Sequence, residues 1–108
     1  MTILEAIKSH SGLSDIADDF VSKVLIDRSV DDGSANYTIE QKKTVELCVA
    51  DCYVEMVNSP DFSEGKFSVK LNRSQLLRSA QDLYWRNGEA SKANKLLLGK
   101  GNSKGAWW

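Results

Sequence analysis

Residues 38–57 read TIEQKKTVELCVADCYVEMV and decide the fold. Thr38 and Gln41 have the spacing of a capping box, in which each side chain accepts a hydrogen bond from the other residue's backbone N–H. Apolar residues then point in nearly every direction around the helix axis: Val45, Leu47, Cys48, Val49, Ala50, Cys52, Tyr53, Val54, Met56 and Val57. Such a helix is normally surrounded by protein. We therefore predict a central helix, or one shared between the core and a subunit interface, that ends at residues 58–60.

Two shorter helices are predicted before the central one. Thr2 and Glu5 form a capping box for the first, which should end at residues 9–12, where polar residues and Gly12 cluster. Ser14 is placed to cap the second helix. Its buried face follows the three and four spacing of an amphipathic helix: Ile16, Ala17, Phe20, Val21, Val24 and Leu25. Residues 31–34, DDGS, favour a turn that ends it.

The hydrophobic period changes after the central helix. Phe67, Val69 and Leu71 alternate with Lys66, Ser68 and Lys70, as in a strand with one buried face. Such a strand must form a hairpin with residues 60–64 or pair with another molecule. Asn72 or Ser74 then caps a helix that ends at Asn87-Gly88. The predicted buried stripe of that helix is Leu76, Leu77, Ala80, Leu83 and Tyr84, and a last short helix follows over residues 89–98.

The predicted fold is all-α, a small bundle of four to five helices with one short β-strand or hairpin between the central helix and the following helix. Residues 1–98 form a single helical domain. Residues 99–108, GKGNSKGAWW, form a flexible basic C-terminal tail that ends in two tryptophans. Exposed tryptophans are unfavourable unless they dock. Trp107 and Trp108 therefore either fold back onto this chain's own core or anchor in a pocket on a neighbouring subunit or partner.

The formal net charge of −1 hides an asymmetry along the chain. Residues 1–65 hold 5 Lys/Arg and 13 Asp/Glu, whereas residues 66–108 hold 9 and 2. Two interpretations stay equally open. Copies could associate head to tail through complementary patches, or the two halves could neutralise each other within the monomer.

The sequence offers no recognisable catalytic or metal-binding set, and we expect no enzyme activity, no metal and no cofactor. His10 is the only histidine and lies in a polar turn, where we expect it to be solvated. Cys48 and Cys52 have no second Cys/His pair to complete a zinc site, so we interpret them as reduced core thiols. Asn36 and Asn72 match the glycosylation pattern, but we interpret both as helix caps. No signal peptide or membrane span is recognised, and the cytoplasm is the expected compartment.

Three stretches carry a resemblance to a known family: residues 50–53 (ADCY), 59–69 (SPDFSEGKFSV) and 83–89 (LYWRNGE). Their order, a long helix, a Glu-Gly loop, a short Phe-Ser strand and a helix, resembles small phage and prophage head-tail connector (adaptor) proteins. The resemblance implies a structural subunit that forms a ring with copies of itself. Its other partners would be portal and tail-completion proteins, in the virion or the bacterial host cytoplasm, with no membrane.

The resemblance also assigns contacts. It implies that DNA passes through the ring lumen without sequence-specific binding. The tail, with Lys100, Lys104, Trp107 and Trp108, would reach the portal. The strand, with Lys66, Phe67, Val69 and Lys70, would make inter-subunit or lumen-side contacts.

The alternative is a small helical DNA-binding or regulatory module that uses the basic C-terminal half, because phosphate neutralisation needs clustered Lys and Arg. The basic residues available for it are Lys66, Lys70, Arg73, Arg78, Arg86, Lys92, Lys95, Lys100 and Lys104.

Overall fold

The computed structural model describes residues 1–10, 12–14, 16–30, 33–59 and 72–98. Within these residues the elements are α1 (Ile3–Lys8), α2 (Asp18–Asp27), the 3₁₀ turn η1 (Ile39–Gln41), α3 (Lys42–Asn58), α5 (Arg73–Arg86) and α6 (Ala90–Leu98). The all-α prediction is confirmed. The strand or hairpin predicted within residues 60–71 and the tail over 99–108 lie outside the described residues. None of the described helices is both long and apolar enough to cross a membrane.

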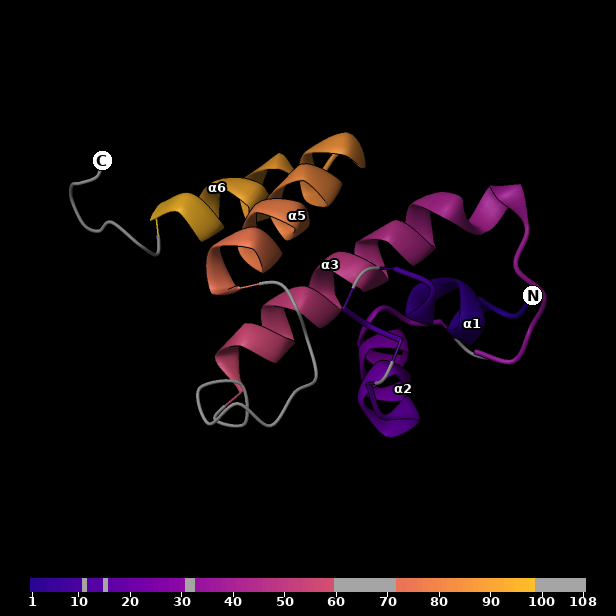
Figure 1. Ribbon diagram of the computed structural model, residues 1–108. Coiled ribbons are helices and arrows are strands. Elements are labelled where there is room, and N and C mark those ends of the chain that lie inside the picture. The colour runs from indigo at the N-terminus through magenta and orange to yellow at the C-terminus, as the bar shows by residue number, and fades with distance from the viewer. Residues whose placement is uncertain (11, 15, 31–32, 60–71, 99–108) are drawn as a thin grey trace.

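Helix α3 lies at the centre of the fold. Figure 1 shows it running between the α1–α2 pair and the α5–α6 pair, and it contacts α1, α2 and α5 directly. Nine of its side chains are buried: Val45, Leu47, Cys48, Val49, Ala50, Cys52, Tyr53, Met56 and Val57. The prediction of a central helix from its apolar pattern is confirmed. Only Val54, among the apolar positions predicted for this helix, is partly exposed.

The two predicted capping boxes, and a third that was not predicted, set the starts of three elements. Thr2 with Glu5 caps α1, Thr38 with Gln41 caps η1, and Asn72 with Gln75 caps α5. Asn72 rather than Ser74 is therefore the cap of α5. The prediction that Asn36 caps a helix is wrong, because its backbone forms an isolated antiparallel bridge with Thr2. This bridge fixes the N-terminus against the segment that leads into α3.

Helix α2 begins later than its apolar pattern predicts. Ala17, not Ser14, is the N-cap, and its backbone is extended without a side-chain cap. Leu13 and Ile16 are buried, but they reach the core from a turn in which the Ile16 N–H donates to the Leu13 carbonyl. Apolar side chains of a tight turn can thus continue the periodicity of a helix without belonging to it.

Helix α5 buries the five residues predicted for its stripe: Leu76, Leu77, Ala80, Leu83 and Tyr84. Gly88 then adopts φ +83°, a conformation that favours glycine, and the chain reverses into α6. Helix α6 packs along α5 and buries Ala93 completely. The helix α5 therefore joins α6 to the central helix.

We expect Leu76→Ala to lower the free energy of unfolding by about 2–5 kcal/mol, because it leaves a cavity between α5 and α3. Leu76 is fully buried, whereas Ile26 on α2 is 72% exposed. Urea unfolding followed by circular dichroism would measure both variants. Ile26→Ala is the control and should change stability by less than about 0.5 kcal/mol. Equal losses in the two variants would contradict the packing described.

Candidate binding groove

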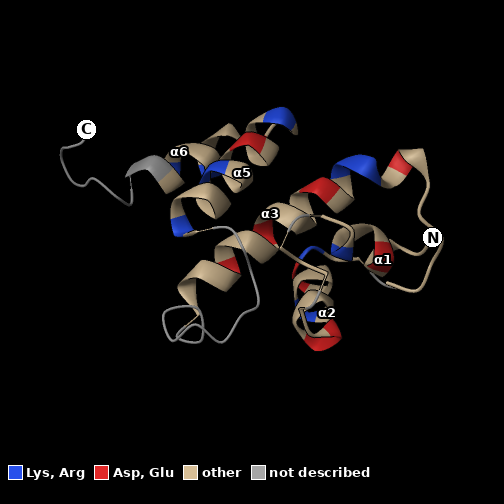
Figure 2. Ribbon diagram, in the orientation of Figure 1, with Lys and Arg blue, Asp and Glu red and all other residues tan. Residues whose placement is uncertain are grey.

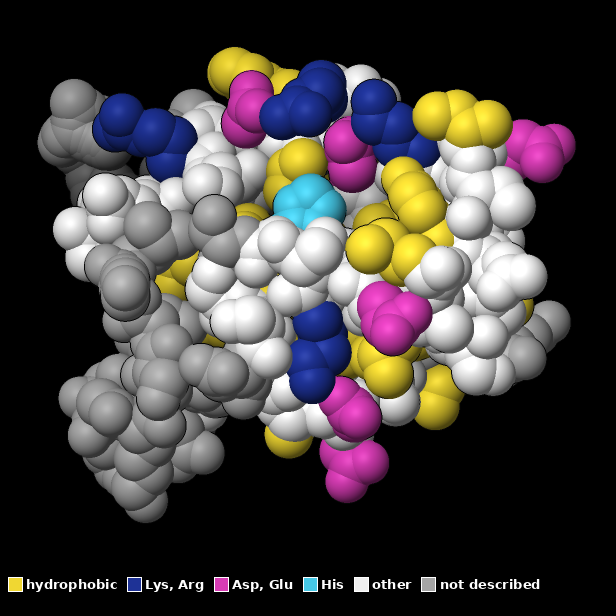
Figure 3. All heavy atoms as spheres, turned by 45° about the vertical axis from the view of Figure 1, so that its right-hand side comes forward, with side chains coloured by type: hydrophobic (Ala, Val, Ile, Leu, Met, Phe, Trp, Pro, Cys, Tyr) yellow, Lys and Arg dark blue, Asp and Glu magenta, His cyan; other side chains and the backbone are white. Residues whose placement is uncertain are grey.

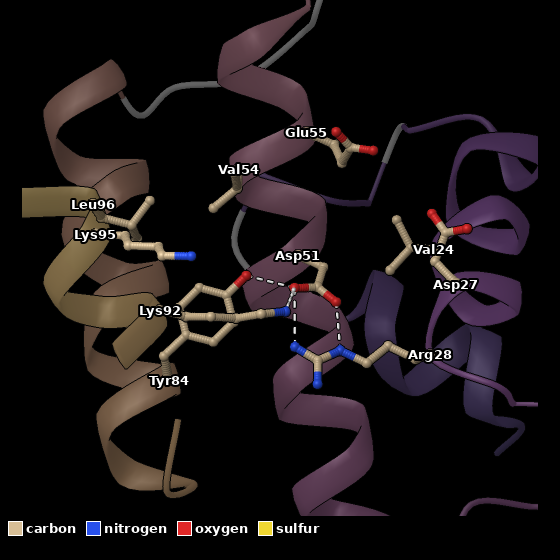
Figure 4. Close-up of a pocket in the computed structure, with 10 residues that line it drawn as sticks. All are labelled: Val24, Asp27, Arg28, Asp51, Val54, Glu55, Tyr84, Lys92, Lys95 and Leu96. Atoms are coloured by element: carbon tan, nitrogen blue, oxygen red, sulfur yellow. Dashed lines mark hydrogen bonds and ion pairs between the residues drawn. The ribbon is translucent and has the colours of Figure 1, made fainter. Parts of the chain in front are cut away.

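A groove of about 450 Å³ opens between α2, α3 and the α5–α6 pair. Figure 4 shows its lining, with α6 and α5 on one side, α3 in the middle and α2 on the other. Val24, Val54 and Leu96 supply apolar surface from three different helices. The volume falls within the range of roughly 300–1,000 Å³ that is usual for ligand sites. Charged side chains surround this apolar surface.

Arg28 and Asp51 form the base of the groove. Arg28 is the C-cap residue of α2, and Asp51 lies in the middle of α3. The guanidinium donates from Nε to Asp51 Oδ2 at 2.5 Å and from Nη2 to Asp51 Oδ1 at 3.1 Å. The two side chains are only 16% and 18% exposed, so the pair is largely withdrawn from water. Two opposite charges can be buried together when two hydrogen bonds join them in this way.

The same guanidinium also holds Glu89, the residue just before α6. Arg28 Nη1 and Nη2 donate to the two carboxylate oxygens of Glu89 at 2.8 and 3.0 Å. The hydrogen bonds from Arg28 lower the pKa of Glu89, and those to Glu89 and Asp51 raise the pKa of Arg28. Arg28 and Glu89 are therefore both charged at neutral pH. One side chain of α2 thus ties the start of α6 to the middle of α3.

Tyr84 and Lys92 complete this cluster. The Tyr84 hydroxyl donates to Asp51 Oδ1 at 2.5 Å, and burial together with that bond raises the pKa of Tyr84. Lys92 Nζ lies 3.9 Å from Asp51 Oδ1 and 5.6 Å from the centre of the Tyr84 ring. The resulting Arg28 cluster comprises Arg28, Asp51, Tyr84, Glu89 and Lys92. Hydrogen bonds and ion pairs thus join residues of α3, α5 and α6 to the end of α2 within this cluster.

The two cysteines do not reach this groove as reactive thiols. Both are buried and free, as predicted. Burial raises the pKa of Cys48 to about 11 and that of Cys52 to about 12, so both are protonated and weakly nucleophilic at neutral pH. Within the described part of the chain, no three His, Cys, Asp or Glu side chains are arranged to hold a metal ion.

His10 is partly buried rather than fully solvated, which corrects the expectation from the sequence. It lies in the turn after α1, and Figure 3 shows the histidine reaching the surface among apolar and charged side chains. Desolvation lowers its pKa, while Glu46 raises it and Arg86 lowers it further. The turn is polar in sequence, but Glu46 near the start of α3 and Arg86 at the end of α5 lie close enough to influence its histidine.

The two helix pairs that flank α3 differ in charge. Helices α1 and α2 carry four Asp/Glu and two Lys, whereas α5 and α6 carry five Arg/Lys and one Asp. Figure 2 shows these charges on the two sides of the central helix. Among the described residues, three ion pairs join the first half of the chain to the second: Arg28 to Glu89 at 2.8 Å, Arg86 to Glu46 at 3.6 Å and Lys92 to Asp51 at 3.9 Å. Neutralisation within the monomer is thus partial.

All the partner-binding residues predicted from the sequence lie outside the described residues: Lys66, Phe67, Val69, Lys70, Lys100, Lys104, Trp107 and Trp108. Sequence reasoning missed the Arg28 cluster. Asp51 was its available signal, since a carboxylate in a helix that is apolar nearly all round must find a partner. Nothing in the local sequence identifies Arg28 and Tyr84 as the partners of Asp51, because they lie 23 and 33 positions away.

The fold and the groove define a small all-α domain built around one interior helix. The chain belongs to a family of unknown function (DUF6706), whose model matches residues 1–98. No curated protein and no solved structure matches the chain. The family description assigns no activity or partner.

We expect Asp51→Asn to lower the free energy of unfolding by about 2–3 kcal/mol, because Arg28 loses a charged partner in a largely buried site. Asp27→Asn makes the same chemical change in the exposed pair with Lys23 and should cost less than about 0.5 kcal/mol. Chemical denaturation of both variants measures the difference. A loss no larger for Asp51 than for Asp27 would show that the cluster does not stabilise the fold.

His10 should make stability depend on pH. Its pKa in the folded chain lies below the ordinary value of 6.5, so the unfolded chain binds the proton more readily. Stability is therefore complete above 6.5 and falls as the pH drops toward the folded-state pKa. His10→Gln should remove this part of the pH dependence, as measured by thermal unfolding from pH 8 to roughly 5. A variant with the wild-type slope would contradict the assignment.

Proposed function

We propose that this protein is a structural head-tail connector (adaptor) subunit of a phage or prophage particle, which forms a ring and joins the portal to the tail. The proposal begins from the resemblance of residues 50–53, 59–69 and 83–89 to such proteins. It includes the portal and tail-completion proteins as partners, and DNA that passes through the lumen without sequence-specific contacts. The segment 99–108 is assigned to the portal, and the short strand predicted over 66–71 to inter-subunit or lumen-side contacts.

The observation that carries the proposal is the charge difference between the α1–α2 pair and the α5–α6 pair. A closed ring needs two different and complementary patches on each subunit, so that one patch meets the other on the next copy. The acidic and basic helix pairs lie on either side of α3, and the ion pair of Arg28 with Glu89 joins them at the base of the groove. Complementary charge on separate surfaces favours head-to-tail association and fixes its register.

The same basic pair supports a second candidate, a helical DNA-binding or regulatory module. Arg73, Arg78, Arg86, Lys92 and Lys95 are exposed on α5 and α6. Phosphate contacts of this kind would bind duplex DNA through counterion release and would weaken steeply with salt. The acidic α1–α2 pair opposes such binding by lowering the local positive potential.

Mass photometry of the purified chain, across protein concentration and salt, tests the connector proposal. We expect oligomers that grow with concentration in the absence of DNA and dissociate as salt screens the complementary patches. Phe67→Ser should weaken self-association by removing the apolar face of the predicted strand, whereas Ser68→Ala, on its opposite face, is the matched control. A strict monomer at every concentration contradicts ring formation by the chain alone. Salt-sensitive DNA binding by that monomer would favour the second candidate.

A further inference from the structure

We propose that the groove between α2, α3 and α6 is the docking site for this chain's own residues 99–108, with Trp107 and Trp108 on its apolar lining. The inference concerns the isolated chain and does not rest on the connector proposal. Four observations support it: the length of the segment, the apolar surface of the groove, the charges around the groove and the attachment of the segment to α6.

The segment begins beside the groove. Leu96, which lines the groove, lies two residues before Leu98, the last residue of α6. The ten residues that follow can span roughly 33 Å when extended, at about 3.3 Å per residue. This length allows the two tryptophans to return across the groove toward α3 and α2. No other part of the fold has to move for the segment to reach it.

The groove offers the surface that an indole ring needs. Val54 on α3 and Leu96 on α6 present partly exposed aliphatic side chains, whereas Val24 and the Tyr84 ring, which also line the groove (Figure 4), are only 2% and 3% exposed. Val54 is the one predicted core position of α3 that stays partly exposed. A tryptophan buries about 150–250 Å² when it packs against such a surface. Docking would therefore cover apolar groups that the described residues leave open.

The charges around the groove are complementary to those of residues 99–108. On the α2–α3 side, Asp27 and Glu55 share one ammonium, that of Lys23, at 2.9 and 3.1 Å. This side therefore keeps an excess negative charge that Lys100 and Lys104 can complement. On the α6 side, Lys95 has no ion-pair partner among the described residues, and its ammonium points into the groove in Figure 4. A cation in that position can stack on an indole face.

Tethering selects the chain's own segment over that of a second copy. A short linker gives an attached group an effective concentration in the millimolar range. A free copy would have to reach the same concentration to compete. Docking within one chain is therefore favoured wherever the linker can span the distance.

The test uses the full chain carrying Trp85→Phe, so that Trp107 and Trp108 are the only tryptophans. Trp85 is 53% exposed and does not line the groove, so its replacement should leave the fold intact. Emission maximum and acrylamide quenching report whether the remaining indoles are shielded from water.

Val54→Lys and Leu96→Glu each place a charge in the groove. Ile26→Glu places one on the exposed face of α2, away from the groove, and is the matched control. Circular dichroism checks that each variant is folded.

We expect blue-shifted emission and quenching severalfold weaker than that of free tryptophan, both independent of protein concentration. Both groove variants should shift the emission to longer wavelength and restore quenching, whereas Ile26→Glu should do neither. Fully quenchable tryptophans in the Trp85→Phe chain would overturn the proposal. So would shielding that disappears on dilution, which would assign the contact to a second copy, and shielding that survives both groove variants.

Discussion

The structure depends on how one carboxylate, that of Asp51, is accommodated in a helix otherwise surrounded by protein. An unpaired charge at this depth would lose its hydration without compensation, at a cost of several kcal/mol. Arg28 and Tyr84 supply three hydrogen bonds to its two oxygens. These partners come from α2 and α5, which flank the central helix on different sides. Asp51 therefore keeps all three hydrogen bonds only when both neighbouring helices are in place.

This requirement explains why the groove has a fixed base. Arg28 holds Asp51 and Glu89 together, so the end of α2 and the start of α6 are fixed at one point. The two helix pairs diverge from that point and leave Val24, Val54 and Leu96 on the walls. A purely apolar contact at the base would permit sliding, whereas paired charged hydrogen bonds have a defined geometry. The cluster thus contributes specificity of arrangement as well as stability.

The parts of the fold that could be predicted are those set by local patterns. The apolar pattern of residues 45–57, the stripe of α5 and three capping boxes all depend on residues within one helix or one turn. The start of α2 was predicted wrongly because Leu13 and Ile16 are buried from a turn that continues the helical period. The Arg28 cluster could not be predicted, since its members meet only after the helices pack. Asp51 indicated that a partner must exist, but not which one.

The groove and the proposed portal contact make competing demands on the same residues. If residues 99–108 bind the portal, they cannot also fill the groove of their own chain. The portal would then have to bind the segment more strongly than the groove does. Docking would therefore reduce the apparent affinity of the segment for the portal. In the free subunit, docking would accordingly prevent non-specific association of the tryptophans until a partner that binds them more strongly is present. A groove of mixed apolar and charged lining would suit this proposed role, because it would hold the segment without the tight burial that makes release slow.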